Sequence, residues 1–333
     1  MPFPAPAAGL PAALQAGNAV TNTPIRTSST WRLRTRKLSL GAHTLVMGVV
    51  NITPDSFSDG GLFLDPDTAV AHALMLLGEG ADLIDLGAES TRPGSRMGGT
   101  ADRTQTPEAH PTVSAEEEQA RLLPVLKGIL RERPDAIVSV DTYKAATARA
   151  TLEGGAEIVN DVSGFMWDEQ MASVCAEFGA GVVLMHTRGR PDEWRTQPQL
   201  ESDALLAAVR AGLSASLAKG AAAGISREAV VLDPGYGFGK RFDENYKLLA
   251  RQAELLSLGC PLLAGISRKS FLRHTLENLH DGGASVEALE NASVAAMTAG
   301  ILHGATIVRV HAVRPAVEAA RIADAILAAA RPA

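Results

Sequence analysis

Short apolar runs alternate with longer amphipathic stretches along most of the chain. Each run has five to eight residues rich in Val, Ile and Leu, as in buried strands, and each precedes a stretch whose apolar residues recur with helical spacing. The pattern predicts strands at 44–51, 82–87, 136–141, 157–161, 181–186, 229–233, 261–267 and 306–310. It predicts helices at 67–80, 115–132, 144–155, 171–179, 202–223, 244–257, 292–304 and 316–329. Eight such units favour a single α/β domain, a closed (β/α)8 TIM barrel, over an open doubly wound sheet.

Two segments fall outside this alternation. Residues 1–30 are rich in Ala, Pro, Gly, Ser and Thr and show no hydrophobic period, which predicts a flexible N-terminal tail before a barrel domain at 31–333. Residues 95–112 are polar and rich in Gly, Thr and Pro, and we interpret them as a loop insertion after the second strand. The N-terminus has no basic start followed by a sustained apolar run, so we expect no signal peptide.

Composition narrows the functional classes. With 46% hydrophobic but only 4% aromatic residues, the core is expected to consist of aliphatic side chains, as in a parallel sheet covered by helices. A net charge of −6 argues against a nucleic-acid or membrane-surface binder, and the absence of a long apolar run predicts no membrane span. Cys175 and Cys260 have no metal-binding spacing and are expected to be buried thiols, which suits the reducing cytoplasm.

Every predicted strand ends in polar or charged residues. In a (β/α)8 barrel the active site lies at these carboxyl ends, so their side chains are candidates for function. Taken singly, an Asp, Asn or Ser at such a position is as well explained by capping of the next helix. Capping does not explain cations, which oppose the positive end of a helix dipole. The strand-end residues are Asn51, Asp85, Glu89, Asp141, Asn160, Asp161, His186, Asp233, Ser267, Arg268, Lys269, Arg309 and His311.

Four of these residues suit a flat heterocycle. Asp141, Asn160, Asp233 and Lys269 are not accompanied by an HxH or HExxH pattern, which disfavours a dedicated metal cluster. An aminopyrimidinone edge presents an amine and a ring N–H to a carboxylate, while its carbonyl and ring nitrogens accept from an ammonium or a carboxamide.

An anionic group is expected beside this heterocycle. Arg309 and His311 are two residues apart on the last strand and therefore share a face, where barrels commonly bind phosphate. Thr91 and Arg92 belong to the same predicted site, and Asn51 offers an oxygen ligand to a Mg²⁺ that keeps most of its waters. Two alternatives stay open: Arg309 paired with a core carboxylate such as Asp85, and His311 as a core histidine.

Two Gly-containing loops are weaker signals. The segment 232–240, LDPGYGFGK, lacks a full dinucleotide fingerprint, and we interpret it as a turn that presents Phe238 and Lys240 over the barrel mouth. The segment 265–271, GISRKSF, places Ser270 and its neighbours at the start of a helix, where the dipole favours anions.

Taken together and in this order, NITPDSFSDGG, DLIDLGAESTRPGS, SVDTYK, EIVNDVSG, VVLMH, LDPGYGFGK, GISRKSF and IVRVHAV resemble the dihydropteroate synthase family from about residue 45 to 314. The resemblance implies condensation of 6-hydroxymethyl-7,8-dihydropterin diphosphate with p-aminobenzoate, inhibition by sulfonamides, a cytoplasmic enzyme and a homodimer. It implies Asn51 as the Mg²⁺ ligand. It further implies that the pterin diphosphate is held by Thr91, Asp141, Asn160, Asp233, Lys269, Arg309, Val310 and His311. The p-aminobenzoate pocket would contain Phe57, Pro93, Phe238 and Ser270, and the catalytic residues would be Asp59, Arg92, Lys269, Arg309 and His311.

Two other functions fit parts of the pattern. A methyltetrahydrofolate-dependent methyltransferase is also a pterin-binding barrel, but it has no need of the TPDSFSDGG loop or of a diphosphate clamp. A barrel that binds pterin without turnover, as a scaffold, is disfavoured by the complete set of motif residues.

Overall fold

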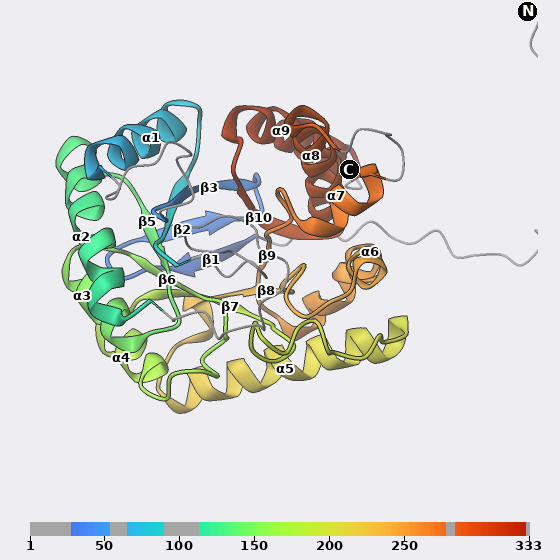
Figure 1. Cartoon of the computed structure of the whole chain (residues 1–333), viewed down its shortest axis with the longest axis horizontal. Helices are drawn as coiled ribbons and strands as arrows, with labels where there is room; N and C mark the ends of the chain where they lie inside the picture. The colour runs from blue at the N-terminus through green and yellow to red at the C-terminus, as the bar shows by residue number, and fades with distance from the viewer. Residues whose placement is uncertain (1–27, 54–64, 90–112, 278–283, 331–333) are drawn as a thin grey trace, which may run out of the picture.

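Eight parallel strands form a closed barrel in a computed structural model that describes residues 28–53, 65–89, 113–277 and 284–330 (Figure 1). The strands are β3 (Leu45–Asn51), β4 (Leu83–Gly87), β5 (Val138–Asp141), β6 (Ile158–Asp161), β7 (Gly181–Met185), β8 (Val230–Asp233), β9 (Leu262–Ala264) and β10 (Ala305–Val310). They pair in chain order, and β10 pairs with β3 to close the ring. The predicted (β/α)8 barrel is therefore confirmed.

At least one helix packs outside the barrel after each strand. These helices are α1 (Pro66–Gly78), α2 (Ala115–Glu132), α3 (Ala145–Glu153), α4 (Met171–Phe178), α5 (Ser202–Ala222), α6 (Phe242–Arg251), α8 (Val286–Leu302) and α9 (Val313–Ala329). A short helix, α7 (Ser270–Glu277), lies between β9 and α8, and it begins in the segment 265–271, where the start of a helix was predicted. The helix expected at 244–257 ends as α6 at Arg251, and the chain continues as the 3₁₀ helix η3 (Gln252–Leu258). None of the described helices combines the length and hydropathy needed to cross a lipid bilayer.

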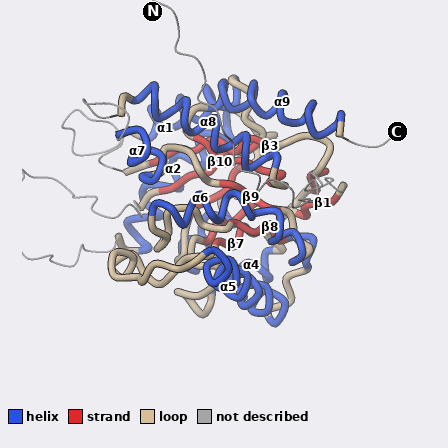
Figure 2. Tube along the Cα trace, turned by 90° about the vertical axis from the view of Figure 1, so that its right-hand side faces the viewer, coloured by secondary structure: helices blue, strands red, loops and turns tan. Residues whose placement is uncertain are grey.

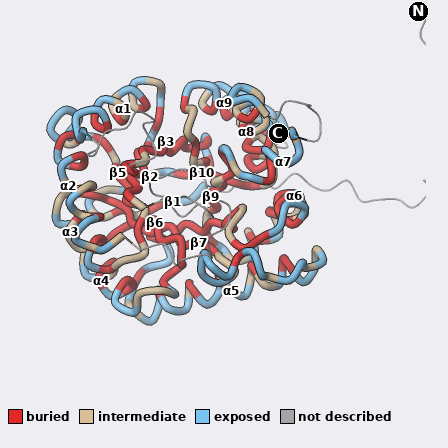
Figure 3. The backbone as a smooth tube through the Cα atoms, viewed as in Figure 1, coloured by how far each residue is buried: buried red, intermediate tan, exposed pale blue. Residues whose placement is uncertain are grey.

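Alternation along the strands divides the apolar residues into two cores. Outward side chains such as Val50 and Leu86 pack against the helices in one large cluster. Inward side chains fill the barrel axis in a second cluster, which includes Leu45, Met47, Leu83, Ile158, Val183, Val231, Leu263 and Ile307. Figure 3 shows the buried strands inside a ring of helices whose outer faces are exposed. Because side chains alternate with a period of two, the strand residues two positions beyond this inner layer also face the axis.

An antiparallel hairpin precedes the barrel and was not predicted. It consists of β1 (Ser29–Arg32) and β2 (Lys37–Leu40), and Figure 2 shows β1 at one end of the barrel. Trp31, Leu33 and Leu40 belong to the inner apolar cluster, so the hairpin covers the amino-terminal end of the barrel axis. The Trp31 indole Nε1 also donates to the Ala229 carbonyl oxygen at 2.9 Å.

The hairpin escaped prediction for a physical reason. Each strand has only four residues, and polar side chains separate its few apolar ones, so the period is too short to recognise. The tail predicted for residues 1–30 consequently ends earlier, because residues 29 and 30 belong to β1, and residues 1–27 lie outside the described part of the chain.

We predict that Trp31→Ala lowers the free energy of unfolding by about 3–5 kcal/mol, because it removes a fully buried indole and leaves a cavity. Urea denaturation followed by circular dichroism would measure the change. Thr30→Ala, on an exposed residue of the same strand, is the matched control. A loss for Trp31→Ala no larger than that of the control would show that the hairpin does not stabilise the barrel.

Candidate active site

Strand register places polar side chains from different strands in one layer at the carboxyl end of the barrel. Asn51 is the register partner of Gly87, which is also the partner of Asp141. Asp141 is in turn the partner of Asn160 on the next strand. Asn51 lies four residues beyond Met47 of the inner cluster and therefore has the same inward direction. The barrel axis thus changes from apolar to polar within one layer.

Arg309, on β10, makes one ion pair with a residue of β4 and one with a residue of β5, and so connects three strands. Its Nε donates to Asp85 Oδ2 at 2.6 Å, and its Nη2 donates to Asp141 Oδ2 at 2.9 Å. Asn160 Nδ2 donates to the same Asp85 oxygen at 3.1 Å, and Asp85 is fully buried. Arg309 therefore makes the core ion pair left open as an alternative, and its two-residue spacing from Ile307 also places it inside the barrel. Asp85 is one of the predicted strand-end candidates, and alternation beyond Leu83 points it inward.

Burial raises the pKa values of Asp141 and Asp233 at the mouth of the barrel. The pKa of Asp141 rises to about 7 because burial penalises its charge and the Asp85 carboxylate adds to the effect, while the Arg309 guanidinium opposes it. Burial also raises the pKa of Asp233, against the hydrogen bond that its Oδ1 accepts from the Gly235 amide at 2.7 Å. Asp141 keeps a fifth of its side-chain surface exposed at the mouth, whereas Asp85 keeps none. Asp141 is therefore accessible to a ligand, and Asp85 supports the cluster from below.

Lys269 and Phe238 form the opposite side of the mouth. The Lys269 Nζ lies 4.0 Å from the centre of the Phe238 ring, a cation–π contact. The Lys269 ammonium also lies near enough to Asp233 to oppose the rise of its pKa. An apolar ring, an ammonium and a carboxylate therefore adjoin one another, with Asp233 and Phe238 following β8 and Lys269 following β9.

The end of β10 presents its side chains in two directions. Ser267 Oγ lies 3.0 Å from His311 Nδ1 and accepts a hydrogen bond from the His311 backbone amide at 3.2 Å, so Ser267 fixes the imidazole. Val310, between Arg309 and His311, has its side chain in the outer apolar core. Any contact of Val310 with a ligand in the barrel would therefore come from its backbone.

Lys240 was expected over the mouth beside Phe238, and this expectation is wrong. Its side chain is buried, and Nζ donates to the carbonyl oxygens of Gly235, His186 and Phe238 at 2.6, 3.2 and 3.3 Å. Burial lowers the pKa of Lys240 to about 7. The lysine therefore lies under its loop rather than in the opening.

Two other polar strand ends point away from the axis. Asp161 accepts hydrogen bonds from the amides of Ser163 and Phe165, both at 2.8 Å, and so shapes the turn after β6. His186 packs so closely on Gly212 of α5 that a Cβ on the glycine would lie 2.4 Å from the ring. Asp161 and His186 are therefore explained by the turn after β6 and by packing on α5, and not by a ligand site on the axis.

The remaining predicted site residues are placed only in part. Ser270 is the exposed first residue of α7, directly after Lys269. The loop segments that carry the other predicted residues, and the insertion at 95–112, lie outside the described residues. These other residues are Phe57, Asp59, Thr91, Arg92 and Pro93.

The residues near Asn51 fit a magnesium ion that takes its remaining ligands from water and a phosphate. A Cβ on Gly87 would lie 3.9 Å from Asn51 Oδ1 and 3.8 Å from Asp141 Oδ2, so the absent side chain leaves a small space between two oxygen donors. Within the described ranges no group of three or more His, Cys, Asp or Glu side chains is arranged to hold a metal. One amide oxygen and one carboxylate suit Mg²⁺, which usually keeps several waters and binds substrate phosphates.

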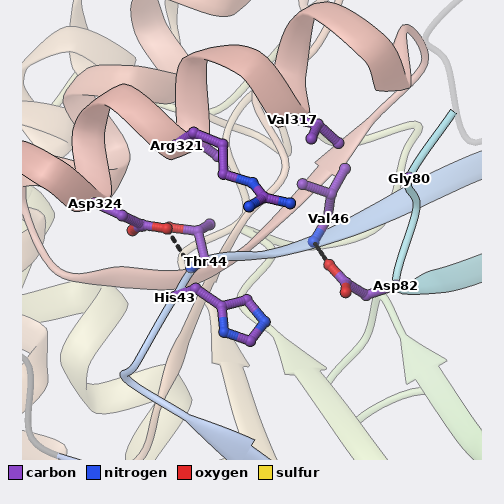
Figure 4. A pocket seen from close by; sticks show the side chains of 9 residues that line it. His43, Thr44, Val46, Gly80, Asp82, Val317, Arg321 and Asp324 are labelled. Carbon is purple, nitrogen blue, oxygen red and sulfur yellow. Dashed lines mark hydrogen bonds between the residues drawn. The ribbon is translucent and has the colours of Figure 1, made fainter.

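A cavity of about 270 Å³ lies at the amino-terminal end of the barrel, between the starts of β3 and β4 and helix α9 (Figure 4). Its carboxylates bind the backbone of the barrel. Asp324 accepts from the Thr44 amide and hydroxyl at 2.8 and 2.7 Å, and Asp82 accepts from the Val46 amide at 2.8 Å. These contacts fix the first barrel strand, so we assign this cavity a structural role.

Comparison with known proteins agrees with the geometry. A family model described as pterin binding enzyme matches residues 47–311. The dihydropteroate synthases of Mycobacterium leprae and Escherichia coli K12 are 42% and 39% identical to this chain, covering 85% and 86% of it and 93% of each relative. The solved structure of Yersinia pestis dihydropteroate synthase with a sulfonamide drug complex has a TM-score of 0.77 at 36% identity, covering 90% of this chain and 99% of that one. The Xanthomonas albilineans enzyme with 4-aminobenzoic acid has a TM-score of 0.76 at 36% identity, covering 91% and 99%.

We predict that Arg309→Met destabilises the fold in a pH-dependent way. The substitution leaves Asp85 and Asp141 without their shared cation, which raises the pKa of Asp141 further. The folded state then holds a proton that the unfolded state has lost, so stability falls as pH rises. The loss should be about 3–5 kcal/mol near pH 7.5 and smaller near pH 5. Urea denaturation at both pH values would measure it, with Arg314→Met, an exposed arginine nearby, as control. Equal losses at both pH values would contradict the proposed coupling.

Proposed function

The chain belongs to the dihydropteroate synthase family of pterin-binding enzymes, and we propose how its described residues share the work of that transferase reaction. The reaction condenses 6-hydroxymethyl-7,8-dihydropterin diphosphate with p-aminobenzoate to 7,8-dihydropteroate and pyrophosphate. The carbon–oxygen bond between the pterin methylene and the diphosphate breaks, and the arylamine nitrogen forms the new bond to that carbon. The nitrogen then releases a proton to water.

The pterin ring binds among the acids and the amide. Asp233 accepts hydrogen bonds from the amine and ring N–H of the pterin, while Lys269 and Asn160 donate to the pterin carbonyl and ring nitrogens. Asp141 lies on the other side of the layer, and Thr91 completes the set of pterin diphosphate ligands. The burial of Asp233 and its hydrogen bond to the Gly235 amide support this role, because they fix the carboxylate before the ligand arrives.

Arg309 and His311 hold the diphosphate and neutralise charge as it leaves. Both share one face of β10, and Asp85 and Ser267 fix their orientations. A preorganised cation stabilises developing negative charge more than mobile water does. Arg309 keeps its orientation because two carboxylates bind it, and it offers the rest of its N–H groups to the phosphates.

Asn51 binds Mg²⁺ in this proposal, with the diphosphate and water supplying the other ligands. When bound, the ion withdraws charge from the departing diphosphate. The space beside Gly87, bordered by oxygens of Asn51 and Asp141, supports the assignment.

The arylamine binds against Phe238 and Ser270 at the outer rim, and Phe57 and Pro93 complete the proposed pocket. The contact between Phe238 and Lys269 brings this pocket next to the pterin site. Positive charge on the pterin methylene is delocalised into the ring, so a neutral amine attacks without a strong base. Asp59 and Arg92 complete the catalytic residues, and sulfonamides compete for the same pocket.

The convergence of Arg309, Asp85, Asp141 and Asn160 on one layer is the single observation that carries this proposal. Residues scattered over more than two hundred positions of sequence meet at one barrel mouth. A barrel that binds pterin without turnover would not need an arginine held between the carboxylates of Asp85 and Asp141, at the end of a strand where barrels commonly bind phosphate.

We predict that mixing the purified chain with both substrates releases pyrophosphate only when Mg²⁺ is present. A coupled phosphate assay would measure release, and removal of the metal with a chelator should lower the rate at least about tenfold. Omission of p-aminobenzoate is the control, since water alone should replace the amine poorly. No release with both substrates and Mg²⁺ would reject the enzyme in favour of a binding scaffold, and release independent of Mg²⁺ would reject the role of Asn51.

We also propose a homodimer formed through α9. Ile322 and Ile326 are four residues apart on one face of this helix and remain 65% and 50% exposed. Analytical ultracentrifugation should give twice the mass of one chain. A variant carrying Ile322→Glu and Ile326→Glu should give the mass of one chain. A monomer at micromolar concentration for the unmodified chain would contradict the proposal.

A cytoplasmic location is part of the same proposal. Cys175 and Cys260 are both buried and unpaired. Free thiols persist in a reducing compartment, which supports the assignment.

A further inference from the structure

Lys240 is a buried cation that the proposed chemistry does not use. Only 6% of its surface is exposed, and its Nζ donates three hydrogen bonds to backbone carbonyls, those of Gly235, His186 and Phe238. A buried ammonium is unfavourable unless its donors are satisfied, and three N–H groups meet three acceptors here. The side chain therefore ties the loop that contains it to the end of β7.

The loop is shaped to make this arrangement possible. Gly235, Gly237 and Gly239 have φ values of 72°, 86° and 68°, a left-handed region that favours glycine. A Cβ on Gly235 would lie 1.9 Å from the His186 carbonyl oxygen, so the loop contacts the strand end directly. Every second residue of the segment 235–239 is thus a glycine that lets the chain curl around one ammonium.

Phe238 is the residue that this loop delivers to the mouth. Its carbonyl accepts from Lys240 Nζ and from the Arg188 amide, the latter at 3.4 Å. Its ring meets Trp194 edge to face at 5.2 Å on one side and the Lys269 ammonium on the other. The orientation of the ring therefore depends on a backbone that Lys240 fixes from beneath.

We propose that Lys240 is a positioning residue for the arylamine substrate, acting through Phe238; the inference rests on the proposed function. Without the ammonium, the buried carbonyls of Gly235 and His186 lose this donor, and the Phe238 carbonyl keeps only its longer bond from the Arg188 amide, so the loop shifts and moves the Phe238 ring. Asp141, Asn160 and Arg309 belong to a separate hydrogen-bonded cluster and keep their contacts, and Asp233 is the pterin ligand that contacts this loop, through the Gly235 amide. The effect is therefore larger for the second substrate than for the first.

The test compares the two substrates in Lys240→Met, which keeps the length of the side chain but removes its charge and donors. The KM for p-aminobenzoate should rise about tenfold, as expected for lost hydrogen bonds to a charged group. The affinity for the pterin diphosphate, measured by calorimetry, should stay within about twofold. In a Phe238→Ala background the same substitution should raise the KM by less than about twofold, because both act through one ring.

Lys219→Met is the matched control, since Lys219 Nζ also donates to a backbone carbonyl, that of Phe165, at 2.9 Å. It should leave both substrates unaffected. Equal losses for both substrates in Lys240→Met, or a full effect in the Phe238→Ala background, would overturn the inference. If Lys240→Met does not fold, Lys240→Arg should still raise the KM at least about threefold, and an unchanged KM would overturn it. Absence of turnover in the unmodified chain would instead reject the proposed function.

Discussion

The guanidinium of Arg309 is the interaction on which the mouth of the barrel depends. It binds Asp85 on β4 and Asp141 on β5, and Asn160 on β6 joins through Asp85, so four strands are connected across the axis. Charges of this kind are unfavourable in a barrel interior unless each has a partner. The ion pairs with Arg309 offset the cost of burying the carboxylates. For Asp141 the cost of burial is the larger of the two effects, which is why its pKa is raised. A ligand with donors and a negative tail fits the same groups.

The floor beneath this cluster makes the balance possible. Inward side chains such as Met47 and Ile307 form a mainly apolar layer beneath Arg309, in which the buried Ser139 of β5 is a polar exception. The hydrogen bonds of the polar layer therefore form in a region of low dielectric. Interactions with a bound ligand would be stronger there than at the protein surface.

Most of the fold could be predicted from periodicity, because eight strands of aliphatic residues each precede a helix and this number of units favours a closed barrel over an open doubly wound sheet. The inward direction of Asn51, Asp141 and Arg309 also follows from a period of two. The hairpin could not be predicted, because four-residue strands carry too little pattern. The position of Lys240 could not be predicted either, because it depends on three carbonyls that the folded loop turns inward. The outward direction of His186 follows from the same period, because it lies three residues past the inward Val183. What could not be predicted is that Gly212 of α5, twenty-six residues away, leaves the room for its imidazole.

The hairpin that carries Trp31 has a consequence for traffic through the enzyme. Its side chains occupy the amino-terminal end of the axis, so among the described residues this end of the barrel is closed. Under the proposed function, substrates and products would therefore pass through the carboxyl end. A pterin bound at Asp233 and Asn160 would lie deeper than an arylamine at Phe238, and an arylamine that bound first would block its path.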